Sequence, residues 1–133
     1  MLILILILVL LQTPILTVVR TIILQPTSGE VIKVIEGSQG TEDSKGKNSY
    51  VFVYDEKNNK TVVYMHCNPK VKVGTQLKKG SLIAIEDNRG TKGTHTHVEV
   101  VDGKSYYARN SVGDFNLENK NPTSYWFSQG YEF

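Results

Sequence analysis

The amino-acid bias of this chain favours strands over helices. Alanine, the best helix former, occurs only twice in 133 residues, at Ala84 and Ala108, whereas valine occurs 15 times and threonine 11 times. β-Branched residues pack well in a pleated sheet and lose side-chain freedom in a helix. Because the chain also has 11 glycines for tight turns, its composition predicts a mainly β fold.

Short segments of alternating or β-branched residues give the positions of the expected strands. Residues 49–55 (SYVFVYD) and 61–66 (TVVYMH) flank the turn 56–60 and predict a β-hairpin. Asp102-Gly103 predicts a second hairpin turn, after which residues 104–108 would pair back. The other expected strands are 30–36, 81–86 and 95–101, and residues 38–48 and 109–122 should be mostly loop.

The first 19 residues carry no charge, and the first charged residue is Arg20. A spanning helix needs roughly 20 apolar residues, a length that this run reaches only if Gln12-Thr13-Pro14 is counted. Three interpretations stay open for it: a membrane anchor or atypical signal, a buried strand or helix of the fold, or an aberrant gene start. We expect residues 1–19 to be this distinct segment and residues 20–133 to form one β domain.

Charge and cysteine content exclude several classes of protein. Fifteen Lys and Arg against 13 Asp and Glu give a net charge of +2, which gives no reason to expect nucleic acid as a partner. The single cysteine, Cys67, excludes a disulfide within the chain and a cysteine zinc finger. A Cys67–His66 catalytic dyad is disfavoured, because adjacent residues on a strand point to opposite faces.

The three histidines of the chain are the candidate site residues. His95 and His97 form a His-Thr-His pair whose side chains should share one face of a strand with Glu99, while Thr96, Val98 and Val100 face the core. Two imidazoles on one face suit a divalent metal such as zinc. His66 ends a neighbouring strand and could reach the same place. On spacing alone, an ordinary pair of surface histidines remains an equal alternative for His95 and His97.

Four ordered motifs add a resemblance to this pattern. They are Pro26–Val31 (PTSGEV), Tyr64-Met65-His66, the glycine- and valine-rich run 71–84 (VKVGTQLKKGSLIA), and 90–100 (GTKGTHTHVEV). In order and spacing, Pro26 to Tyr107 resembles the lysostaphin- and LytM-type zinc endopeptidases, metallopeptidase family twenty-three. The resemblance implies a mainly antiparallel β-sheet domain of the LytM type. The strands that hold the three histidines would form the base of its groove.

The resemblance also implies a chemistry and a setting. His97 matches the family's zinc ligand on this strand, His95 a catalytic histidine beside the metal-bound water, and His66 a second catalytic histidine that stabilises the oxyanion. The implied cofactor is zinc, and the implied reaction is hydrolysis of amide bonds in peptidoglycan peptides. The implied location is extracytoplasmic: secreted, anchored in a membrane through residues 1–19, or associated with a phage virion.

One element of the family is missing. Two further zinc ligands come from an upstream His-x-x-x-Asp motif, which would fall within residues 1–19, where the chain has no His, Asp or Glu. Three explanations stay open, in this order: a truncated or misread gene start, a pseudoenzyme that binds cell wall or a protein partner, and an unusual three-histidine metal site. Whether the chain is an enzyme is therefore left open, with a non-catalytic binding module as the alternative.

Overall fold

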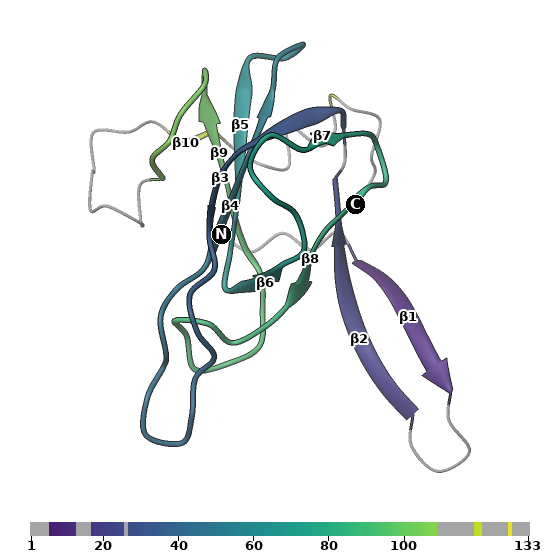
Figure 1. The fold of residues 1–133 in the computed structure, drawn as a ribbon, viewed down its shortest axis with the longest axis vertical. Helices are drawn as coiled ribbons and strands as arrows, with labels where there is room; N and C mark the ends of the chain where they lie inside the picture. The colour runs from purple at the N-terminus through teal and green to yellow at the C-terminus, as the bar shows by residue number, and fades with distance from the viewer. Residues whose placement is uncertain (1–5, 13–16, 26, 109–118, 121–127, 129–133) are drawn as a thin grey trace.

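The computed structural model describes residues 6–12, 17–25, 27–108, 119–120 and 128, whose strands form two antiparallel sheets (Figure 1). The four-stranded sheet has the order β1 (Leu6–Gln12), β2 (Thr17–Leu24), β8 (Leu82–Glu86), β6 (Cys67–Pro69). The six-stranded sheet has the order β10 (Asn119–Lys120), β9 (His97–Asp102), β5 (Lys60–Met65), β4 (Tyr50–Asp55), β3 (Gly29–Ile35), β7 (Gln76–Leu77). The predicted mainly antiparallel β fold is confirmed.

The β4–β5 hairpin is the centre of the six-stranded sheet. Its pairing runs from Asp55↔Lys60 beside the turn to Tyr50↔Met65 at the open end, as the alternating sequence predicted. Strand β9 lies along the other side of β5, with His97 opposite Met65. The open end of the hairpin therefore lies next to the first residue of β9.

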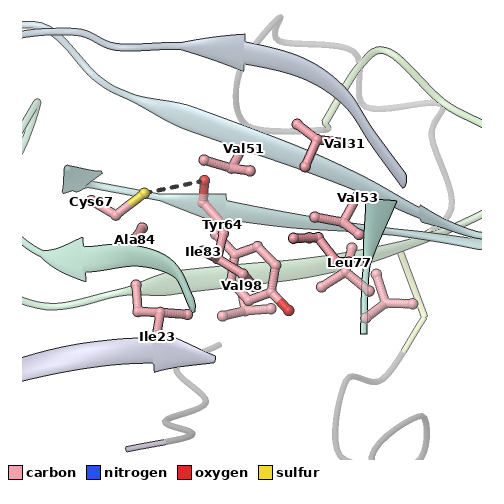
Figure 2. Packing of buried hydrophobic residues seen from close by; sticks show 12 residues of the cluster. Ile23, Val31, Val51, Val53, Tyr64, Cys67, Leu77, Ile83, Ala84 and Val98 are labelled. Carbon is pink, nitrogen blue, oxygen red and sulfur yellow. Dashed lines mark hydrogen bonds between the residues drawn. The ribbon is translucent and has the colours of Figure 1, made fainter. Parts of the chain in front are cut away.

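The two faces of this sheet bury different residues. One face packs on the four-stranded sheet through a cluster that Figure 2 shows from close by. That cluster comprises Ile23, Val31, Val51, Val53, Val62, Tyr64, Cys67, Leu77, Ile83, Ala84, Val98 and Val100. The opposite face buries a smaller cluster of Ile32, Tyr50, Phe52, Val63, Met65 and Ala108. The alternation of a strand assigns His97 and Glu99 to this second face, since Val98 and Val100 belong to the first cluster.

One sequence prediction for the end of the domain is wrong. Residues 104–108 do not pair back onto β9 after Gly103. Instead, the N–H of Gly103 donates to the carbonyl of Asn59 at 2.8 Å, and the N–H of Ser105 donates to Thr61 Oγ1 at 2.9 Å. The segment thus crosses the β4–β5 hairpin, and β10, in a region expected to be loop, pairs with β9 at Val100 and Val101. The remainder of that expected loop, 109–118 and 121–122, lies outside the described residues.

The apolar N-terminal segment contributes strands where it is described. Strands β1 and β2 form an antiparallel hairpin, which leads away from the rest of the molecule (Figure 1). Strand β2 joins β8 between Ile22 and Leu24, and Ile23 is buried in the core between the sheets. Within the described residues, no helix has the length and apolar character to cross a membrane. The three interpretations of residues 1–19 stay predictions.

Candidate functional site

His66 lies where the chain crosses from one sheet to the other. It is the single residue between β5 and β6, and its φ of 62° falls in the left-handed region that non-glycine residues seldom adopt. Its N–H is 3.3 Å from both the carbonyl of Ser49 and Oδ1 of Asn48. These acceptors hold a backbone conformation of the kind that clusters at functional sites.

His95 and His97 come to the same place from the start of β9. The expected strand 95–101 begins at His97, because His95 forms an isolated bridge with Asp87 just before it. The ring centroid of His66 is 4.8 Å from that of His95 and 6.3 Å from that of His97. The structure thus brings together the three residues that the sequence singled out, while their chemical roles stay predictions.

Hydrogen bonds fix which ring nitrogens are engaged. Nδ1 of His66 is 2.8 Å from the carbonyl oxygen of Arg89, and Nδ1 of His95 is 2.9 Å from that of Gly93. A carbonyl oxygen only accepts, so each Nδ1 must carry the hydrogen. In their neutral forms both rings therefore present Nε2 as a free acceptor.

His97 is oriented by a buried carboxylate. Its Nε2 is 3.2 Å from Oε1 of Glu99, whose side chain is 3% exposed. The carboxylate accepts from Nε2–H, which leaves Nδ1 of a neutral His97 as the acceptor nitrogen. The sequence prediction that Glu99 shares the face of His97 is confirmed, and so is the core-facing position of Thr96, Val98 and Val100.

Asn48 connects the site to the outer face of the sheet. Its Nδ2 donates to the hydroxyl of Tyr50 at 2.8 Å, while its Oδ1 accepts from the N–H of His66. Burial raises the pKa of Tyr50, the hydrogen bond from Asn48 lowers it, and the charge of nearby Glu99 raises it further. Tyr50 therefore stays protonated at neutral pH and can donate to a ligand or a neighbour.

The electrostatics of the site favour a neutral His66. Burial lowers the pKa of His66, the hydrogen bond to Arg89 opposes that change, and the nearby His95 and His97 lower it further. A neutral imidazole is the form that can accept a proton or bind a metal. Burial and the two neighbouring rings thus favour the neutral form of His66 over the positively charged form.

Cys67, next to His66, has its thiol buried away from solvent. Its side chain is completely buried in the cluster between the sheets, with Sγ 3.9 Å from the carbonyl of Tyr64 (Figure 2). Burial raises the pKa of its thiol to about 11. A protonated, inaccessible thiol is a poor nucleophile, in agreement with the sequence argument against a Cys67–His66 dyad.

The described residues do not by themselves fit the zinc that the resemblance implies. His97 has one feature of a ligand, a carboxylate behind Nε2 that orients the ring. Catalytic zinc sites usually have three protein ligands. Within the described ranges, no group of three or more His, Cys, Asp or Glu side chains could hold a metal ion.

A surface hollow of about 460 Å³ lies between two loops near the histidines. It is lined by residues 40–45 of the β3–β4 connection and by Asn88, Thr91 and Lys92. Between Asn88 and Thr91 lie Arg89, whose carbonyl contacts His66, and Gly90. Sequence reasoning did not identify this hollow, nor Asn48 and Arg89, because nothing in their local sequence shows which histidine they meet.

The fold is similar to that of solved lysostaphin-type β domains. The structure of LytU matches with a TM-score of 0.54 and 23% identity over 86% of this chain and 78% of that chain. The solution structure of lysostaphin matches with a TM-score of 0.54 and 18% identity over 86% of this chain and 44% of that chain. No family model matches the chain, and neither does any curated protein. The fold predicted from the four motifs is therefore confirmed.

Proposed function

We propose that this chain is a lysostaphin-type domain that acts on peptidoglycan peptides at the site formed by His66, His95 and His97. The convergence of three imidazoles at the sheet crossing, with the hydrogen-bonded nitrogen of each ring defined, is the observation that carries the proposal. LytU and lysostaphin share the fold, and the four sequence motifs supply the link to cell-wall peptides.

The orientation of each ring gives each histidine a different proposed role. His95, whose Nε2 is a free acceptor in the neutral ring, is the general base for a water molecule. His66 has the same orientation and a lowered pKa, so its neutral form accepts a hydrogen bond from water or from a peptide N–H. The oxyanion role that the resemblance gives His66 requires a donor, which Nε2 becomes only when the ring is protonated. His97 is the proposed metal ligand.

Peptidoglycan binding and hydrolysis test this function directly. The purified chain should co-sediment with insoluble peptidoglycan, and His66→Ala or His95→Ala should weaken binding severalfold while leaving the fold intact. Lys70→Ala, at an exposed position away from the histidines, is the control. We expect little or no hydrolysis of peptidoglycan or cross-bridge peptides, with or without added zinc, because a single imidazole ligand does not fix a tetrahedral metal. A chain that neither binds nor cleaves peptidoglycan contradicts the proposal.

A chain extended by an upstream segment bearing His-x-x-x-Asp tests the catalytic roles. Hydrolysis should then appear, His95→Ala should abolish turnover while sparing much of the metal binding, and His97→Ala should lose the metal. Zinc-dependent cleavage by the chain as it stands would instead support a site made by His66, His95 and His97 themselves.

A non-catalytic cell-wall binding module is the second candidate. It is favoured by the finding that the described part of the chain offers no group of three metal-binding side chains. Zinc content of the purified chain separates the candidates: one tightly bound equivalent favours the enzyme, and none favours the module.

The proposed setting is extracytoplasmic, with residues 1–19 as a segment separate from a β domain of residues 20–133. Deleting residues 1–19 should improve solubility and leave the domain folded, since an uncharged apolar run has no polar face to present to water. Loss of the folded domain on deletion would show that the segment belongs to the core.

A further inference from the structure

The loop after β8 is anchored by a mostly buried ion pair that has no role in the proposed chemistry. Nε of Arg89 donates to Oδ2 of Asp87 at 2.9 Å, with the two side chains only 15% and 11% exposed. Nη1 of Arg89 also donates to the carbonyl of Glu36 at 2.7 Å. One guanidinium therefore joins the residue after β8 to the residue after β3.

The carboxylate of Asp87 is held from several sides. Its Oδ1 accepts from the N–H of Asn88 at 2.8 Å and from Nε2 of Gln39 at 3.2 Å, while Oδ2 accepts from Arg89. Multiple donors to one carboxylate fix its orientation as well as its charge. The position of the Arg89 guanidinium is therefore set by a partner that is itself immobilised.

Both residues of this ion pair contact a histidine through their main chains. The carbonyl of Arg89 accepts from Nδ1 of His66 at 2.8 Å. The carbonyl of Asp87 accepts from the N–H of His95 at 3.4 Å in the bridge before β9. The side-chain bonds thus anchor the loop at the two residues whose carbonyls contact His66 and His95.

We propose that Asp87 and Arg89 are positioning residues, whose ion pair holds their carbonyl groups so that His66 keeps its hydrogen on Nδ1 and His95 stays beside it. Without the guanidinium, the loop keeps main-chain and amide contacts such as Gly90 N–H to Lys45 carbonyl at 2.8 Å and Gly40 N–H to Asn88 Oδ1 at 3.2 Å. The Gly90 N–H shares a planar peptide unit with the Arg89 carbonyl, so its bond to Lys45 restrains the plane of that carbonyl. The ion pair adds an anchor on the Arg89 side of the unit, which sets the position of the carbonyl relative to His66. The positioning role itself is independent of the proposed function, and only its effect on peptidoglycan binding rests on that function.

Two-bond proton–nitrogen NMR on the labelled full chain measures the tautomer of His66 directly, at a pH where the ring is neutral. The unsubstituted protein should show His66 as the Nδ1–H tautomer. Arg89→Ala should bring up the Nε2–H tautomer that free histidine favours, and peptidoglycan binding should fall severalfold. Arg89→Lys keeps the charge but cannot bridge Asp87 and Glu36 together, so it should resemble the alanine variant. Lys47→Ala, which removes an exposed cation from the β3–β4 connection, should leave the ring unchanged.

Asp87→Asn keeps the fold testable if Arg89→Ala does not fold, since the amide oxygen can still accept from the N–H of Asn88. It should shift His66 in the same direction by a smaller amount. An Nδ1–H tautomer unchanged in folded Arg89→Ala or Asp87→Asn would overturn the proposal. A tautomer change in a chain that neither binds nor cleaves peptidoglycan would support the positioning role and reject the proposed function.

Discussion

Replacing Gly90 by alanine should destabilise the protein more than the same replacement at Gly103. Both glycines have a φ of +74°, so either alanine bears a left-handed backbone cost of about 1–2 kcal/mol. They differ in surroundings: a Cβ at Gly90 would lie 2.6 Å from Cα of Asn48, whereas one at Gly103 meets nothing within 4 Å. Overpacking against backbone adds about 1–3 kcal/mol. We expect losses of about 2–5 kcal/mol for Gly90→Ala and about 1–2 kcal/mol for Gly103→Ala.

Urea unfolding followed by circular dichroism measures both free energies. The entropy that alanine removes from the unfolded chain is the same in the two variants, so it cancels in their difference. The difference, about 1–3 kcal/mol, therefore reports the close approach of the two loops. Because Asn48 accepts from the N–H of His66, Gly90→Ala should also disturb the His66 resonances, and Gly103→Ala should not. Equal losses of stability would refute the argument that Gly90 is required by contact with Asn48.

Three further predictions concern single side chains. Thr96 has a buried hydroxyl with no hydrogen-bond partner among the described residues, so Thr96→Val should raise the free energy of unfolding by about 1 kcal/mol; a loss in urea unfolding would contradict this. Cys67, buried with a pKa of about 11, should resist a thiol reagent at pH 8 in the native protein and react in urea, and rapid native labelling would count against its burial. The pKa of His66 is lowered from 6.5, so the unfolded chain takes up the proton first and stability should fall as the pH drops below about 6.5; His66→Gln should flatten this part of the stability–pH curve, and an unchanged slope would disprove it.

The sequence predicted best those elements whose partners are close in the chain. The β4–β5 hairpin follows from two β-rich runs around a short turn, and the face shared by His97 and Glu99 follows from the two-residue period of a strand. The four ordered motifs indicated the fold and predicted that His66 lies near His95 and His97. Each of these inferences uses information carried within a few residues or in a fixed order along the chain.

Contacts between distant segments were not predictable in this way. The turn at Asp102-Gly103 looks like a hairpin turn, but the N–H of Gly103 donates to Asn59 and the N–H of Ser105 donates to Thr61. Strand β10 pairs with the edge of β9 instead. Arg89 bonds to the carbonyl of Glu36, 53 residues earlier, and no local pattern distinguishes it from a solvated arginine. The tertiary environment decides both outcomes.

The chain passes between its two sheets at the histidines themselves. His66 is the step from β5 to β6, and His95 bridges to Asp87 just after β8, whereas His97 belongs wholly to the six-stranded sheet. The distances between the three rings therefore depend on how the two sheets pack against each other. A change of side-chain volume at Ala84 or Ile83, in the core between the sheets, should therefore change the distances between the imidazole rings without direct contact with any of them.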